Sequence, residues 1–115
     1  MTMTLHELLK FPQVTILTTM VCAGNRRKEQ NMTREGYGFN WGSARVSTAL
    51  FTGVLTNEVL KLAKPKYMCM EGADKLPNGY YGTSIRLSTA MDSAMGVMLA
   101  YKINGELLTP DQGRS

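Results

Sequence analysis

Apolar and β-branched residues occur in several short runs along the chain, and each run predicts a strand. Residues 14–21 carry such side chains at both alternating sets of positions, as a strand does when it is covered on both faces. Residues 44–51, 67–70 and 97–103 have a similar character and predict further strands. Cys22 directly follows the first run, so we expect it at the end of a buried strand.

The start of the chain predicts a short helix. Thr4 and Glu7 have the spacing of a capping box, in which each side chain bonds to the backbone N–H of the other residue. Met3 and Leu8 are spaced to form the hydrophobic contact that often accompanies such a box. Pro12 then ends the helix, because proline lacks the N–H that a helix interior needs.

A second helix is predicted from Thr56, as its N-cap, to a point before Pro65. Residues 74–82 are rich in turn-forming types, and the Asn-Gly pair at residues 78–79 is the strongest turn signal among them. A second Asn-Gly pair at residues 104–105 predicts a tight hairpin turn. Without repeats or linkers, the chain is expected to combine α and β elements in one piece.

The composition is that of a soluble, folded domain. With 115 residues the chain holds one domain at most. Hydrophobic residues make up 43% and charged residues 19% of it, which excludes a disordered polar tract and a membrane protein. No cationic segment leads into an apolar run at the start, so we expect no secretory signal. Cys22 and Cys69 are then expected to be free thiols in the reducing cytoplasm.

The residue types that suggest chemistry are concentrated around Cys22. Arg26, Arg27 and Lys28 follow it closely, and nearby cations favour the thiolate, which is the form of cysteine that attacks substrates and binds metals. Gly24 allows the backbone to turn closely around a bound group. A guanidinium can also donate two parallel hydrogen bonds to an oxyanion. The cluster therefore indicates a metal centre or a nucleophile that acts on an oxyanion.

Each of these features also has an ordinary structural interpretation. A cysteine near an apolar strand is most often a core residue, which we expect of Cys69 and which residue type alone favours for Cys22. The basic residues 26–28 could be a solvated surface, and the interleaved basic and aromatic pattern of nucleic-acid-binding proteins is missing. Trp41 could be a core residue, and Asp74 is by default a turn residue. The net charge of +4 suits an anionic ligand without requiring one.

Zinc and cysteine-protease chemistry can be set aside. Two cysteines and one histidine at these positions do not assemble a closed tetrahedral zinc site. A cysteine protease would need His6 as its base, and nothing in the sequence marks His6 for that role. If Cys22 binds a metal, a group other than protein must supply most of the ligands.

Several blocks of the sequence resemble the sulfite oxidase and nitrate reductase family of molybdenum enzymes. The segment CAGNRR at residues 22–27 is similar to the signature around the molybdenum-binding cysteine, and its extension to residue 32 resembles the nitrate reductase branch. Further similar blocks are GFNWG at 38–42, YGTSI at 81–85, AMD at 90–92 and NGELLTPD at 104–111. The blocks follow the family's order and span nearly the whole chain.

The resemblance implies an α+β fold, here a mixed-sheet fragment of the sulfite oxidase-type molybdopterin-binding domain. It implies a molybdenum–molybdopterin cofactor, in which a pterin dithiolene provides sulfurs to the metal and Cys22 adds the protein thiolate. By the same resemblance Arg27 binds the oxyanion, Trp41 lies beside it, and Asp74 hydrogen-bonds the pterin. Gln112 would contact the anionic end of the cofactor, where the family usually has histidine; glutamine donates a hydrogen bond without a positive charge.

The activity that the resemblance implies is reduction of nitrate to nitrite by oxygen-atom transfer. Electrons would come through a haem domain from an FAD domain of the same full-length chain, which is expected to form a homodimer. Residues 1–115 would then be a partial molybdopterin-binding domain, truncated at both ends and unable to enclose the cofactor alone. A sulfite oxidase-like enzyme and a truncated, non-catalytic binding domain remain as alternatives.

Overall fold

The computed structural model describes residues 3–60, 66–77 and 79–112, and the chain divides into two compact units. The smaller unit is Leu17–Leu50, and the larger unit combines Met1–Ile16 with Phe51–Ser115. The strands β1 (Gln13–Val21) and β2 (Val46–Leu55) contribute to both units, because the boundaries between the units fall inside these strands. Both strands were predicted, and β2 continues beyond its predicted end at residue 51.

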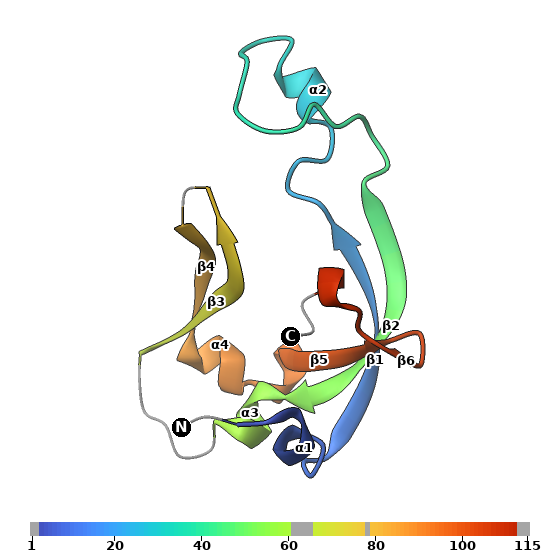
Figure 1. Ribbon diagram of the computed structural model, residues 1–115, viewed down its shortest axis with the longest axis vertical. Helices are drawn as coiled ribbons and strands as arrows, with labels where there is room; N and C mark the ends of the chain where they lie inside the picture. Colours follow the sequence, from blue (N-terminus) through green and yellow to red (C-terminus); the bar gives the residue numbers. More distant parts are fainter. Residues whose placement is uncertain (1–2, 61–65, 78, 113–115) are drawn as a thin grey trace. The chain divides into compact units, whose positions relative to one another are not determined.

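The larger unit contains an antiparallel arrangement of β2, β5 (Met98–Ile103) and β6 (Glu106–Leu107), drawn in Figure 1. The strand order of the whole sheet is β1-β2-β5-β6. Phe51 stands opposite Ile103, and the register of β2 against β5 shifts between Thr52 and Gly53. The strand predicted at residues 97–103 is therefore confirmed as β5.

The turn between β5 and β6 has the predicted form. Asn104 and Gly105 have positive φ angles of 50° and 88°, as both central residues of a type I′ turn require. Asparagine and glycine adopt this left-handed region more readily than other residues do. The Asn-Gly pair thus turns the chain directly from one strand into the next.

A second sheet consists of β3 (Tyr67–Leu76) and β4 (Gly79–Arg86), which form the antiparallel hairpin visible in Figure 1. The prediction of a strand at residues 67–70 followed by a turn-rich stretch was too restrictive, because most of that stretch belongs to the two strands. An irregular register between Glu71 and Lys75 accommodates the turn-forming residue types. Asn78 lies outside the described residues, and Gly79 next to it has a φ angle of 105°.

Buried Thr56 joins α3 (Thr56–Val59) to the rest of the larger unit. The residue is 2% exposed, and its Oγ1 lies 2.5 Å from the carbonyl oxygen of Ala90 and 3.2 Å from that of Val97. The prediction that Thr56 caps the helix with its side chain is wrong, since Leu55 occupies the N-cap position. The hydroxyl instead turns inward and donates to carbonyls, because buried polar groups need partners. The end of the helix predicted before Pro65 lies outside the described residues.

We expect Thr56→Val to lower the free energy of unfolding by about 1–3 kcal/mol, the usual cost of leaving a buried hydrogen-bonding group unpaired. Valine has nearly the shape of threonine but cannot donate to the Ala90 carbonyl. Chemical denaturation measures the loss. Thr56→Ser is the control because it keeps the hydroxyl; if it is as unstable as the valine variant, the hydrogen bond is not the cause.

The helix α1 (Leu5–Leu8) begins as predicted. The Glu7 N–H donates to Thr4 Oγ1 at 3.3 Å and the Thr4 N–H donates to the Glu7 carboxylate at 2.8 Å, which completes the capping box. The backbone and side-chain donors of Thr4 hold the pKa of Glu7 below its ordinary value. Met3 and Leu8 line a common small cavity, and their direct contact stays a prediction.

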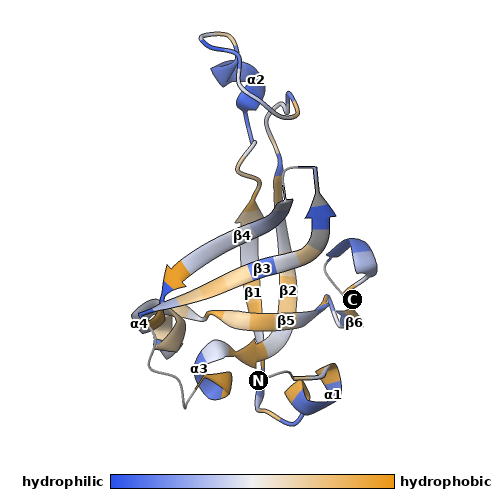
Figure 2. Ribbon diagram, turned by 60° about the vertical axis from the view of Figure 1, so that its left-hand side comes forward, coloured by the Kyte–Doolittle hydropathy of each residue, from blue (hydrophilic) through white to orange (hydrophobic). Residues whose placement is uncertain are grey.

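β1 is not covered on both faces, contrary to the prediction. Val14, Ile16 and Thr18 are partly buried, whereas the other residues of the strand are exposed, with Leu17 at 66% and Val21 at 63%. Among the described residues of the smaller unit, the only helix is the four-residue α2 (Arg27–Gln30). Figure 2 shows α2 as hydrophilic. The smaller unit therefore has no apolar helix of its own to cover the second face of its strands.

Three further helical segments complete the description, and none of them was predicted from the sequence. They are α4 (Leu87–Met91), η1 (Ser93–Met95) and η2 (Pro110–Gln112). Helices and antiparallel sheets together confirm the α+β class. Within the described ranges, every helix is too short or too polar to cross a lipid bilayer.

Candidate functional site

Cys22 directly follows β1 in the smaller unit and lies opposite Arg45, which directly precedes β2. The Cys22 N–H donates to the Arg45 carbonyl at 2.9 Å. Earlier along β1, the hydroxyl of Thr19 lies 2.7 Å from that of Thr48. Because the partner's number rises as the number on β1 falls, the two strands pair in antiparallel register. Residues directly opposite each other in such a pair carry their side chains on the same face. The side chains of Cys22 and Arg45 therefore project from one face of the strand pair.

A tight turn follows Cys22 and leaves its thiol exposed. The Asn25 N–H donates to the Cys22 carbonyl at 2.8 Å, and the Gly24 N–H donates to Cys22 Sγ at 3.4 Å. Cys22 is a free, exposed cysteine. It is therefore not the core residue that its residue type alone suggested. Cys69 is also free and exposed, in β3 opposite Ser84. The prediction of a core position for Cys69 is therefore wrong, because a hairpin of two strands cannot cover both of its own faces.

Arg27 and Trp41 lie together against Gly24. A Cβ atom on Gly24 would stand 2.7 Å from Trp41 Cδ1 and 2.9 Å from a terminal nitrogen of Arg27. The Arg27 guanidinium also donates to the Phe39 carbonyl at 3.1 Å, and a Cβ atom on Gly38 would be 2.5 Å from it. Only glycine allows so close an approach at both positions. The missing side chains of the two glycines thus leave room for the guanidinium of Arg27.

Two backbone hydrogen bonds join the arms of the loop that carries this cluster. The Arg26 N–H donates to the Gly42 carbonyl at 3.1 Å and the Lys28 N–H donates to the Trp41 carbonyl at 2.9 Å. Arg26 has a left-handed φ of 63°, and its guanidinium forms an ion pair with Glu29 at 2.5 Å. Hydrogen bonding within this pair lowers the pKa of Glu29 and raises that of Arg26. Arg26 is therefore engaged by a carboxylate of its own loop.

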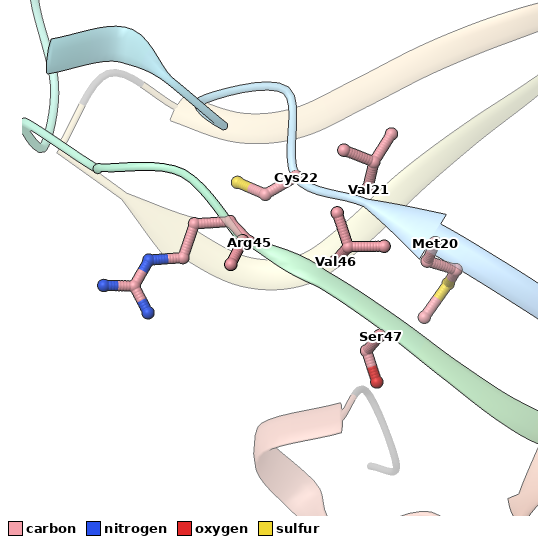
Figure 3. A pocket seen from close by; sticks show the side chains of 7 residues that line it. Met20, Val21, Cys22, Arg45, Val46 and Ser47 are labelled. Atoms are coloured by element: carbon pink, nitrogen blue, oxygen red, sulfur yellow. The ribbon is translucent and has the colours of Figure 1, made fainter.

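Arg45 is a site residue that sequence reasoning missed. Its guanidinium carbon lies 4.6 Å from the centre of the Trp41 ring, which is the geometry of a cation–π contact. Arg45 and Cys22 both line an open cavity of about 560 Å³, and Figure 3 shows the thiol and the guanidinium extending in the same direction. No local motif marks Arg45, because only the strand register brings it opposite Cys22. The residues that line the cavity are Met20, Val21, Cys22, Ala44, Arg45, Val46 and Ser47.

Asp74 and Gln112, the remaining predicted cofactor contacts, belong to the larger unit. The backbone of Asp74 lies in β3, so the default prediction of a turn residue is wrong, and its side chain lies outside the described part of the chain. Gln112 is exposed in η2, and its side-chain oxygen accepts a hydrogen bond from the Thr109 N–H at 3.1 Å. Its amide nitrogen is therefore the atom that can donate to an anion.

The donor set around Cys22 fits a metal that brings ligands of its own. Cys22 offers one soft sulfur at the cavity, and thiolates suit transition metals rather than hard cations. In the described ranges, no three residues of the His, Cys, Asp and Glu types gather into a group that could hold a metal ion. The cation of Arg45 lines the same cavity. The arrangement can thus bind a soft metal centre with an anion beside it.

The chain matches the family model of the oxidoreductase molybdopterin binding domain over residues 1–114. It is 61% identical over 111 residues to an NADPH nitrate reductase of Aspergillus niger, and 60% identical over 116 residues to that of Leptosphaeria maculans. These alignments cover 93% and 96% of this chain but 13% of each relative. The chain therefore corresponds to a small part of the length of these relatives.

Among solved structures, the chain is similar to the sulfane dehydrogenase SoxCD of Paracoccus pantotrophus. The TM-score is 0.69 and the sequence identity 30%, over 93% of this chain and 27% of that one. This similarity agrees with the expected sulfite oxidase-type fold. Because the family model covers nearly all of its residues, the chain belongs to the oxidoreductase molybdopterin-binding domain family, whose cofactor class is molybdopterin.

Proposed function

We propose that this chain is part of the catalytic molybdenum domain of an NADPH-dependent nitrate reductase, which reduces nitrate to nitrite. The observation that carries the proposal is the exposed thiol of Cys22, at a cavity that Arg45 also lines and within the motif CAGNRR. The names of the relatives support both the substrate and the electron donor, since they are NADPH nitrate reductases. The sequence alone left the choice between NADH and NADPH open.

Cys22 is the proposed protein ligand of molybdenum. Its sulfur is exposed and lines the cavity, and the turn through Gly24 and Asn25 keeps it at the end of β1. When bound, the molybdopterin cofactor supplies further sulfur ligands and a redox-active metal for oxygen-atom transfer from nitrate. The role of the protein at this position is to present one soft anionic ligand in a fixed place.

Arg27 and Trp41 are the proposed substrate-binding residues of the loop, with Arg27 also catalytic. A guanidinium has five N–H donors, so the hydrogen bond from Arg27 to the Phe39 carbonyl leaves donors for an oxyanion. The same hydrogen bond orders the guanidinium beside Gly24 and Gly38, and a side chain that is already ordered loses less entropy when it binds. Trp41 packs against the same Gly24 and presents its ring beside the arginine.

Asp74 and Gln112 are the proposed cofactor-binding residues of the larger unit. Asp74 would accept hydrogen bonds from the pterin, and Gln112 would donate one from its amide nitrogen to the anionic end of the cofactor. A neutral amide attracts an anion less strongly than a cation does. We therefore propose that other contacts carry more of the cofactor affinity in this protein.

The chain is proposed to be one part of a larger molybdopterin-binding domain. It corresponds to 13–14% of the length of the relatives. An exposed apolar face that includes Leu17 and Val21 supports a further layer, because such faces normally pack against something. We place the haem and FAD domains elsewhere in the full-length protein, which we propose to be a cytoplasmic homodimer. Neither a nucleic acid nor a membrane is proposed as a partner.

A sulfite oxidase-like enzyme is the second candidate, and similarity to a sulfane dehydrogenase favours it. The test is to assay the full-length enzyme with nitrate and NADPH, and separately with sulfite and an electron acceptor. We expect turnover of nitrate and none of sulfite. Turnover of sulfite alone would overturn the substrate assignment, and turnover of neither would support the non-catalytic binding domain.

A further inference from the structure

The backbone of Arg45 is fixed on both sides by the segment that carries Cys22. Its carbonyl accepts the hydrogen bond of the Cys22 N–H at 2.9 Å. Its own N–H donates to Asn25 Oδ1 at 2.9 Å. The residue therefore cannot shift along the strand pair without breaking contacts on the turn that holds the thiol.

The guanidinium of Arg45 is also held in place. Its central carbon lies over the ring of Trp41, 4.6 Å from the ring centre. The Trp41 ring is in turn tilted against Phe39, at 5.2 Å between ring centres. A guanidinium has five N–H donors, and a cation–π contact uses none of them as a hydrogen bond to an oxygen, so donors remain for an anion.

Three of the four arginines between β1 and β2 have different partners. Arg26 is paired with the carboxylate of Glu29, and Arg27 donates to the Phe39 carbonyl between two glycines. Arg45 lines the cavity at Cys22, and it is the charged residue among those that line it in the described chain. The other side chains that line the cavity are mostly apolar and include no carboxylate. None of them would therefore compete with a bound anion for the guanidinium of Arg45.

We propose that Arg45 is a specificity-determining residue of this site, which draws an oxyanion into the cavity at Cys22 and binds it there. The inference rests on the proposed function for the identity of the anion, which is nitrate. Cys22 and Arg45 lie opposite each other where β1 ends and β2 begins. The pairing of these two strands therefore positions both the proposed metal ligand and the proposed anion-binding residue. Arg45 would act beside Arg27, from the opposite arm of the loop.

The first test measures the electrostatic environment of Cys22 without any turnover. Iodoacetate and iodoacetamide alkylate the same thiolate, so the ratio of their rates reports the local potential and not the fraction of thiolate. In the cofactor-free full-length protein, we expect Arg45→Met to lower the iodoacetate-to-iodoacetamide ratio at Cys22 by up to about fivefold, which is roughly the effect of removing a unit charge at contact distance in water. Mass spectrometry reads the ratio at Cys69 in the same sample, where no change is expected.

Two variants make this result specific. Arg45→Lys keeps the charge and should keep most of the ratio. Arg34→Met removes an equal charge from an exposed position of the same unit and should leave the ratio at Cys22 unchanged. An unchanged ratio in Arg45→Met, or an equal fall in Arg34→Met, would overturn the proposal, because the potential at Cys22 would not come from Arg45.

The second test uses the full-length holoenzyme. We expect Arg45→Met to raise KM for nitrate about tenfold or more, as the loss of a charged hydrogen-bond donor usually does, while kcat and molybdenum content change little. Arg45→Lys should recover part of the loss. A fall in kcat or in molybdenum content at constant KM would assign Arg45 a structural role and overturn the proposal. If the enzyme used sulfite and not nitrate, the alkylation result would stand while the proposed function failed.

Discussion

The Cys22→Ser variant of the full-length enzyme is expected to lose nitrate reduction entirely. Serine has a hydroxyl of similar size, but it is a hard and poorly ionised ligand where a soft thiolate is needed. Changes to residues that merely support a metal ligand commonly cost about 10–100-fold in affinity or activity, so loss of the ligand itself should cost more. Steady-state nitrate reduction with NADPH, together with molybdenum content, measures the effect.

Cys69→Ser is the matched control for this experiment. Cys69 is the other free, exposed cysteine and lies in β3 of the larger unit. We expect this variant to retain the activity of the parent enzyme, since its thiol has no proposed role. Undiminished turnover in Cys22→Ser would refute the assignment of Cys22 as the metal ligand.

Gly53→Ala is expected to give the largest loss of stability, about 3 kcal/mol or more in the free energy of unfolding, at the upper end of what overpacking costs. Gly53 is buried at the register shift between β2 and β5. A Cβ atom there would stand 2.3 Å from the carbonyl oxygen of Leu99 and 2.8 Å from the Cα atom of Ala100. Both atoms belong to the backbone of β5, so the strands must separate to admit the methyl group.

Gly82→Ala provides the matched control, because Gly82 is also a strand glycine of the larger unit. Its Cβ atom would lie at an ordinary contact distance of 3.7 Å from the Met70 carbonyl oxygen. We expect this variant to unfold near the midpoint of the parent chain in chemical denaturation. Equal stability of Gly53→Ala and Gly82→Ala would show that β2 can move away from β5 at little cost.

Local sequence signals predicted the elements whose causes are local. The capping box of Thr4 and Glu7 forms within one turn of helix, and the Asn-Gly pair at residues 104–105 turns the chain through its own φ angles. Each depends on residues within a few positions of one another. Their identity was therefore enough to predict the structure.

Long-range pairing decided the elements that were mispredicted. Thr56 has the residue type of an N-cap, but the carbonyls of Ala90 and Val97 draw its hydroxyl inward. The stretch after Met70 has turn-forming residue types, but pairing with β4 keeps most of it extended. Propensity is a weak preference that such tertiary hydrogen bonds override.

For the site too, the sequence predicted some features and only the tertiary structure decided the others. The sequence by itself determined the family and singled out Cys22, because the motif CAGNRR is contiguous and its chemistry depends on residue types at short spacing. Only the tertiary structure decided that the thiol is exposed and that Arg45 shares its cavity. Exposure depends on which layers cover a strand, and the partner of Cys22 depends on the register of β1 against β2. Neither is a property of any short segment, so neither can be deduced from the residues around the cysteine.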